Sequence, residues 1–186
     1  MKFDAKTLIK PVTNVLGIAI AWYALAQFNA WLFSGLEHTS RAHWIFLPAA
    51  FRPLIILMFG WVGAVGLVLG AYLTVYGTAD GDAFHEMIFS VILGITPWIA
   101  VSLGKWALNI PRTLAGLGAW HIVMLCTLCA SANAVALNGY LWASGRFEGG
   151  LIQIVTVFVG DLVGAALVLF LVANVLAFVM PRRSSM

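Results

Sequence analysis

The segment 54–76 carries no charged side chain and is long enough to cross a lipid bilayer, which takes roughly 20 apolar residues. Similar apolar segments recur along the chain, which is 62% hydrophobic and only 9% charged. Because soluble domains contain about 25% charged residues, this composition excludes a water-soluble fold. The apolar segments are continuous and do not alternate at every second residue, which excludes a transmembrane β-barrel. The sequence therefore predicts an all-α, polytopic membrane protein.

We predict a single transmembrane domain over residues 1–186, with a polar head (1–11) and a polar tail (181–186). Its fold is a helix bundle of five spans plus a short half-helix or wedge. The spans are expected at residues 12–33, 54–76, 85–104, 114–144 and 151–180. The fourth is about 30 residues long and would have to tilt strongly. Lysines of the head and arginines of the tail both favour the cytoplasmic side, whereas five crossings would separate the two ends, so the parity of crossings stays open.

The half-helix is predicted at residues 44–51, a short apolar run that Arg52-Pro53 separates from the second span. At 1.5 Å per residue this run extends about 12 Å as a helix, against a hydrocarbon core of about 30 Å. It cannot cross alone, and such backbone is tolerated at membrane depth only inside protein or beside a wet cavity. We therefore expect the stretch 44–76 to set the packing of the other helices and to hold one end of a site.

Glycines are concentrated in the second and last spans. Small residues let neighbouring helices approach closely in lipid, and each glycine inside a helix costs up to about 1 kcal/mol relative to alanine. We therefore expect these glycines to face protein and not lipid. They are Gly60, Gly63, Gly66, Gly70, Gly160 and Gly164.

Asp161 lies about 15 Å into the last span at 1.5 Å per residue, near the expected bilayer centre. A lone charge there costs at least roughly 2.5–3.5 kcal/mol, so intramembrane charges tend to face the bundle and pair. Arg52 stands between two apolar runs, and we predict that the two side chains meet directly or through water. In the alternative, Arg52 extends to the lipid headgroups and Asp161 is protonated or capped by a neighbouring helix.

Polar and aromatic side chains of other spans extend this predicted site. Asn133 and Asn138 could complete the hydrogen bonds that the charged pair leaves open, and His121 and Trp98 are expected to bound the cavity. We interpret Trp22, in the first span, as an anchor at the membrane interface. These residues form a ligand-binding or buried polar cluster, with no catalytic role.

No metal site and no cofactor are predicted. Cys126 and Cys129 share a helix face, but free cysteines inside a span are usually small packing residues. Glu37, His38 and His43 do not have the spacing of a metal site, and we interpret the segment that contains them as a solvated loop.

Enzymatic activity is not expected, because the sequence contains no HExxH, GxSxG or Walker motif and no paired catalytic carboxylates. Haem would need two axial ligands facing one cavity, and only His85 and His121 lie in spans, with His85 at a helix end. The net charge of +3 resides at segment ends. It indicates membrane topology and contact with lipid headgroups, and no nucleic-acid binding.

Two groups of residues carry a family resemblance. The first is WIFLPAA (44–50), FGW (59–61) and GA (70–71), and the second is Asn133, Asn138 and GDLVG (160–164). Together they resemble the MASE1 family of bacterial membrane sensor domains, in which a W-x-P-x-G-type half-helix precedes a glycine-rich span and a polar helix precedes a span with G-D-x-x-G. Ala50 stands where the family usually has glycine. The resemblance implies a compact, stand-alone relative that signals through a partner protein.

The sequence thus favours a sensory or accessory subunit of the bacterial inner membrane. Such a subunit would act by binding another membrane protein or a second copy of itself, with a small ligand in an intramembrane cavity. The alternative is a small transport module resembling the substrate-binding membrane component of a vitamin-uptake system. In both cases the lipid bilayer surrounds the chain.

Overall fold

The computed structural model describes residues 5–35, 37–39, 42–76, 82–111, 113–114 and 116–179. Within these residues the chain is almost entirely helical, which confirms the all-α prediction apart from one small hairpin. The long helices are α1 (Ala5–Leu32), α4 (Ala83–Ala107), α5 (Ala119–Ala143) and α6 (Gly150–Val179). The short elements are β1 (Glu37–Thr39), β2 (Ala42–His43), η1 (Leu47–Ala50), α2 (Phe51–Phe59) and α3 (Trp61–Val75).

Four helices of the described part are long and apolar enough to cross a membrane. Their apolar segments are Ile9–Leu32, Ala83–Ala107, Ala119–Ala143 and Gly150–Val175. The chain is therefore a multi-pass membrane protein by helix length and composition, but the prediction of five full spans is not confirmed. The polar head is helical from Ala5, and the tail 181–186 lies outside the described residues.

The predicted second span, 54–76, is the one that the structure divides. Gly60 has φ +57° and ψ −129°, a conformation that only glycine adopts readily, and it ends α2 and begins α3. At 1.5 Å per residue, the 9 residues of α2 extend about 14 Å and the 15 residues of α3 about 22 Å. Neither reaches the roughly 30 Å of a hydrocarbon core.

The short half-helix exists, but its bounds differ from the predicted 44–51. It is the apolar helical piece Leu47–Phe59, formed by η1 and α2 together. Arg52-Pro53 does not end it, because Pro53 lies in the first turn of α2, where the missing N–H has no intrahelical partner to lose. The expectation that this piece is too short to cross alone is confirmed.

The fourth predicted span, 114–144, is also shorter than expected. Helix α5 has 25 residues and begins at Ala119, because Leu114 and Gly116 have φ of +57° and +76° and cannot continue a helix. A strong tilt is therefore not needed. Helix α4 continues through Pro97.

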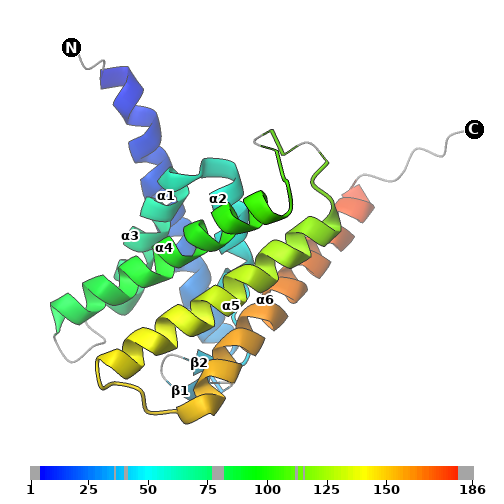
Figure 1. Cartoon of the computed structure of the whole chain (residues 1–186). Coiled ribbons are helices and arrows are strands. Elements are labelled where there is room, and N and C mark those ends of the chain that lie inside the picture. Colours follow the sequence, from blue (N-terminus) through cyan, green and yellow to red (C-terminus); the bar gives the residue numbers. More distant parts are fainter. Residues whose placement is uncertain are drawn as a thin grey trace, which may run out of the picture.

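The helices pack in chain order, with α1 against α3, α3 against α4, α4 against α5 and α5 against α6. Figure 1 shows α5 and α6 side by side, with the β1–β2 hairpin near the first turns of α6. The half-helix closes this arrangement, because η1 contacts α1, α5 and α6, while α2 contacts α3, α4 and α5. As expected from the sequence, the stretch 44–76 thus organises the packing of the bundle.

Of the four glycines of the segment 54–76 that were predicted to pack, three do so. An added Cβ would meet Ile55 at Gly63, Ile18 at Gly66 and Trp22 at Gly70, all at 2.7–2.9 Å. A Cβ at Gly60 would meet no heavy atom within 4 Å. The packing role predicted for Gly60 is therefore wrong, and this glycine instead allows the break between α2 and α3.

Candidate functional site

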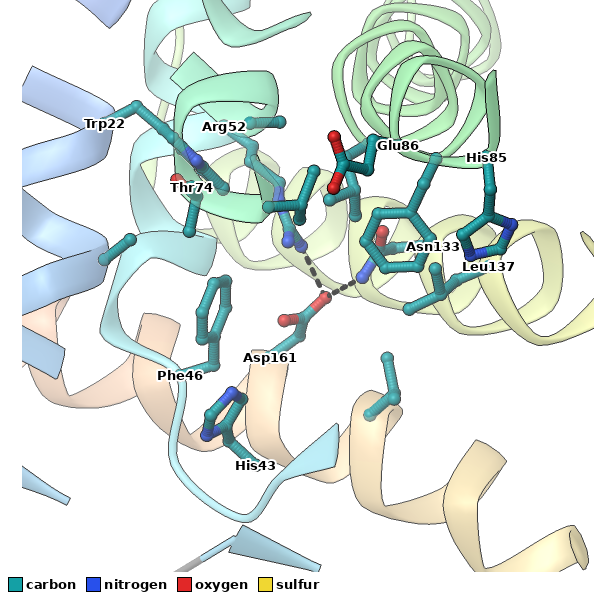
Figure 2. A pocket seen from close by; sticks show the side chains of 16 residues that line it. Trp22, His43, Phe46, Arg52, Thr74, His85, Glu86, Asn133, Leu137 and Asp161 are labelled. Atoms are coloured by element: carbon teal, nitrogen blue, oxygen red, sulfur yellow. Dashed lines mark hydrogen bonds and ion pairs between the residues drawn. The ribbon is translucent and has the colours of Figure 1, made fainter. Parts of the chain in front are cut away.

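The predicted contact between Arg52 and Asp161 is present in the interior of the bundle. Arg52 Nη1 donates a hydrogen bond of 2.6 Å to Asp161 Oδ2, and the two side chains are 3% and 4% exposed. Asn133 Nδ2 donates a second bond, of 2.7 Å, to the same oxygen. Figure 2 shows the three side chains converging from α2, α5 and α6. The alternative in which Arg52 extends to the headgroups is therefore wrong.

Asp161 is positioned by glycines on either side of it in α6. The backbone carbonyl groups of His43 and Phe46 lie where Gly160 and Gly164 would carry a Cβ. The N–H of Phe46 also donates to the carbonyl of Gly160 at 3.1 Å. The close approach predicted for this glycine pair is confirmed, although its partners are the end of β2 and the loop before η1 and not a helix.

A buried asparagine of α1 holds the other side of this loop. Asn29 Oδ1 accepts the N–H of Leu47 at 2.8 Å, and Asn29 Nδ2 donates to the carbonyl of Ile45 at 3.3 Å. Asn29 is 1% exposed. The segment that leads into η1 is thus fixed between α1 and α6, and this orients Arg52 at the start of α2.

Two aromatic rings flank the Arg52 guanidinium. Its Cζ lies 5.2 Å from the ring centre of Trp22 and 5.2 Å from that of Phe46. Both distances fit cation–π interactions, which strengthen when the cation is desolvated. Trp22 is 3% exposed, so the interfacial role predicted for it is wrong, and it instead belongs to this site.

A cavity of about 300 Å³ adjoins the charged pair. Its wall combines charged, polar, aromatic and aliphatic side chains from most elements of the bundle (Figure 2). The lining residues with polar groups are Trp22, His43, Arg52, Thr74, His85, Glu86, Asn133 and Asp161. This volume is at the lower end of the range for small-molecule sites.

Several buried polar atoms of this wall have no hydrogen-bond partner among the described residues. They are Trp22 Nε1, Arg52 Nε and Asn133 Oδ1. Buried polar groups are nearly always hydrogen-bonded, and each exception calls for an explanation such as a water molecule or a ligand. All three residues line the cavity, whereas these three atoms themselves are buried.

A second polar group extends from the cavity towards the first turn of α4. His85 Nδ1 and the Tyr140 hydroxyl are 2.7 Å apart, and their rings stack with centres 5.1 Å apart. Asp82, at the N-cap of α4, accepts the N–H of His85 at 3.1 Å and a bond from Arg146 Nη2 at 2.6 Å. The backbone N–H of His85, followed by the charge of Arg146, lowers the pKa of Asp82.

The remaining predicted site residues lie away from the cavity. Asn138 follows Asn133 by five residues, which turns it about 140° around α5, and its amide donates instead to the carbonyl of Ala134 at 2.7 Å. His121 lies in the first turn of α5 and accepts the N–H of Gly118 at 3.1 Å. Trp98 is 38% exposed and is not among the lining residues. The predicted cavity boundary of His121 and Trp98 is therefore wrong.

Sequence reasoning missed several residues of this site. His43 was assigned to a solvated loop, but β2 returns to the bundle, with Ala42 fully buried and His43 at the cavity wall. Glu86 was not considered, although a carboxylate in the first turn of an apolar helix is a signal in the sequence. His85 was considered only as a haem ligand. No cluster of metal-binding side chains occurs among the described residues.

Both cysteines are buried, as predicted for packing residues. Cys129 packs with α1, α2, α3 and α4 in the main core cluster, whereas Cys126 belongs to a smaller cluster with Ala50 and Ala165. Neither cysteine lines the cavity. The candidate site consists of the Arg52–Asp161 ion pair with the Asn133 amide, the two aromatic rings beside the guanidinium, and the adjoining cavity.

Comparison of the chain with protein-family models, with curated proteins and with solved structures found no match. The class that the fold and site define is a helical multi-pass membrane protein with a buried, charged cavity.

Proposed function

We propose that this chain is a sensory or accessory subunit of the bacterial inner membrane that binds a small ligand in the cavity beside Arg52, Asp161 and Asn133. The observation that carries the proposal is a cavity of about 300 Å³ in the interior of the bundle, lined by the buried Arg52–Asp161 ion pair and by Asn133. Empty cavities in proteins are normally apolar, and buried polar groups recruit water or a ligand. The resemblance to MASE1 sensor domains favours the same function.

In this proposal, the half-helix transmits ligand binding in the cavity to the surface of the bundle. Arg52 belongs to α2, which contacts α3, α4 and α5 and is joined to α3 only through the break at Gly60. A ligand that hydrogen-bonds to Arg52 would favour one placement of α2 over another, and a ligand shifts a conformational equilibrium by its differential affinity for the two states. In this proposal, a partner membrane protein or a second copy of the chain reads that placement.

Gentle purification from native membranes, in lipid nanodiscs, tests the ligand. We expect mass spectrometry of an extract to find a small molecule retained in near-stoichiometric amount by the wild type. The variant Ala71→Leu adds bulk to the cavity wall at a residue other than Arg52 and Asp161, and it should lose the molecule. Ala166→Leu, at an exposed position of α6, is the matched control and should retain it.

The same preparations test the partner. We expect a membrane protein, or a second copy of this chain, to copurify in an amount that changes between the wild type and Ala71→Leu. Absence of any retained molecule, or equal retention by Ala71→Leu, would contradict the ligand. A partner bound equally by both preparations would contradict the coupling.

A small transport module is the second candidate, favoured by the division of the segment 51–75 into two short helices. Helices broken near the substrate site are a feature of secondary transporters, and Arg52 lies at the start of one of these pieces. Proteoliposomes separate the two functions. If the retained molecule accumulates inside vesicles, the chain transports it, whereas binding without accumulation supports the sensory function.

A further inference from the structure

We propose that the start of α1 and the end of α6 both lie on the cytoplasmic side of the membrane, and that the cavity receives its ligand from the opposite, extracytoplasmic side. The topology follows from the directions of the helices and from the distribution of charge. The route of the ligand follows from the place of the cavity in the bundle, and this part rests on the proposed function.

Contacts at two glycines give the relative direction of α1 and α3. A Cβ at Gly66 of α3 would meet Ile18 of α1, and a Cβ at Gly70 would meet Trp22. The residue numbers increase together on the two helices. Helices α1 and α3 therefore run in the same direction, and the chain between them must return to the end at which α1 began.

The later helices alternate in direction. A Cβ at Gly104, near the end of α4, would meet Leu125, near the start of α5. His85, in the first turn of α4, instead lies 2.7 Å from the hydroxyl group of Tyr140, near the end of α5, so these helices are antiparallel. Figure 1 shows the same reversal between α3 and α4 and between α5 and α6.

The bundle thus has two ends formed by different elements. One end, which we call the basic end, contains the start of α1, the end of α4, the start of α5 and the end of α6. The other end, the hairpin end, contains the β1–β2 hairpin, the end of α3 and the start of α4. In Figure 1 the basic end is the upper side of the bundle and the hairpin end is the lower side. Because α1 starts and α6 ends at the same end, the number of crossings is even.

The two short helices between α1 and α4 leave this parity unchanged. The half-helix follows the hairpin, and α3 ends at the hairpin end. A Cβ at Gly63 of α3 would lie 2.8 Å from the carbonyl oxygen of Ile55 in α2. Eight residues of a straight helix would separate these positions by about 12 Å, so α2 and α3 fold back on each other. They form a re-entrant pair, and the four long helices make the crossings.

Lysines and arginines are concentrated at the basic end. Arg52 is held in the buried ion pair, and only Arg41 and Arg146 belong to segments of the hairpin end. The other lysines and arginines belong to segments of the basic end, and they are Lys2, Lys6, Lys10, Lys105, Arg112, Arg182 and Arg183. Loops rich in these residues stay on the cytoplasmic side of a membrane. This places the basic end in the cytoplasm and the hairpin end outside.

The cavity lies in the extracytoplasmic half of the bundle. Each lining residue that belongs to a helix comes from the half of that helix next to the hairpin end. Thr74 is in the last turn of α3, and His85 and Glu86 are in the first turn of α4. Towards the basic end, about 21 Å of helix separates the lining residue Leu93 from Ala107, at 1.5 Å per residue. The shorter path for a ligand is therefore from the extracytoplasmic side.

Single cysteines test the topology in bacterial spheroplasts that express the full chain. Ser144→Cys, at an exposed position of the hairpin end, should react with a membrane-impermeant maleimide in intact spheroplasts. Thr7→Cys at the start of α1 and Ser184→Cys in the tail should react only after permeabilisation. The native Cys126 and Cys129 are buried, so the wild type is the blank.

Thr74→Cys tests the route, since Thr74 lines the cavity next to the hairpin end. The probes are two small, membrane-impermeant methanethiosulfonates, one cationic and one anionic, so that the charge of the lining does not decide the result. At least one of them should modify Thr74→Cys in right-side-out vesicles, and this modification should be lost in inside-out vesicles. Thr113→Cys, at an exposed position between α4 and α5, is the matched control and should show the reverse.

The outcomes separate this proposal from the proposed function. Labelling of Thr7→Cys and Ser184→Cys from opposite sides overturns the even number of crossings, and labelling of both from outside overturns the orientation. Modification of Thr74→Cys from the cytoplasmic side, or from neither side, overturns the route of the ligand. Ala71→Cys, one turn earlier in the lining of α3, replaces Thr74→Cys if size-exclusion profiles show that this variant is not folded. The molecule retained from native membranes decides the proposed function independently.

Discussion

Arg52 Nη1 lies 2.6 Å from Asp161 Oδ2, although the two residues are 109 positions apart in the chain. Both side chains are almost fully buried, so removal of one partner leaves the other charge without compensation. In the interior of soluble proteins such a change costs about 3–5 kcal/mol. The pair thus joins the half-helix to α6 and makes the stability of the bundle depend on both residues.

Asp161→Asn should lower the thermal stability of the purified protein by about 3–5 kcal/mol, because the buried guanidinium loses its counter-charge. The measurement is the loss of the monodisperse size-exclusion peak after heating in detergent. The double exchange Arg52→Asp with Asp161→Arg should recover part of the loss. No recovery, with both single variants folded at low temperature, would count against a direct electrostatic pair.

The ion pair of Arg146 and Asp82 offers a control with the same distance of 2.6 Å but with side chains 32% and 42% exposed. Exposed pairs contribute little, since water screens them and their side chains lose entropy on pairing. Arg146→Met should therefore change the melting temperature much less than Asp161→Asn. If both variants lower the melting temperature equally, burial does not make the Arg52–Asp161 pair more important for stability than the exposed pair.

The sequence was sufficient to predict this pair because charges are rare in the apolar segments. Asp161 stands alone in its span and Arg52 interrupts another, so the cost of isolated charges in a membrane made each the best partner of the other. Asn133 was predicted as a polar side chain that could complete the hydrogen bonds of this pair, and it does so. The all-α class and the packing of Gly63, Gly66 and Gly70 also followed from local patterns.

The rest of the site depends on tertiary contacts that no local pattern specifies. Trp22 resembles an interfacial anchor, but the Arg52 guanidinium that it covers comes from another helix. His43 belongs to a polar stretch, and only the contact of the loop with α6 brings it to the cavity. The helix break at Gly60 could not be predicted from the sequence, because Gly60 has the same spacing of three residues as Gly63 and Gly66, which pack against other helices.

Asp82 gives a prediction for pH dependence. The backbone N–H of His85 and then Arg146 lower its pKa below the ordinary value of 3.8. A group with a lowered folded-state pKa contributes stability above its unfolded pKa and loses it as pH falls through the folded value. Melting temperatures measured from about pH 6 to pH 3 should therefore fall less steeply for Asp82→Asn than for the wild type. Parallel curves would show that Asp82 contributes nothing to acid sensitivity.

Gly60→Ala tests the number of full spans. An added Cβ would meet nothing within 4 Å, but φ of +57° with ψ of −129° is a backbone conformation that strains alanine by about 1–3 kcal/mol. We expect a loss of stability of that size in heat-denaturation curves. Gly17→Ala, in α1 with equally open surroundings, is the control and should be neutral or stabilising. If Gly60→Ala is also neutral, α2 and α3 can join into one continuous helix, and the predicted fifth span would be restored.

The contact between α6 and the loop before η1 gives the last prediction. A Cβ at Gly164 would collide with the carbonyl oxygen of Phe46, and one at Gly160 with that of His43. Backbone atoms cannot rotate away as a side chain can, so the loop must lift from α6 and strain the bond from Phe46 to Gly160. Gly164→Ala should therefore destabilise the protein by about 1–3 kcal/mol, the usual cost of overpacking.

The loop also carries residues of the cavity wall, so the effect should extend beyond stability. Because Phe46 covers the Arg52 guanidinium, lifting the loop should weaken retention of the cavity ligand at temperatures where Gly164→Ala is still folded. Gly139→Ala is the matched control, since its Cβ would meet nothing within 4 Å on α5 and alanine favours the helix. The two measurements are heat denaturation and mass spectrometry of the retained molecule. Gly164→Ala behaving like Gly139→Ala in both would show that the loop tolerates a methyl group and does not depend on this close approach.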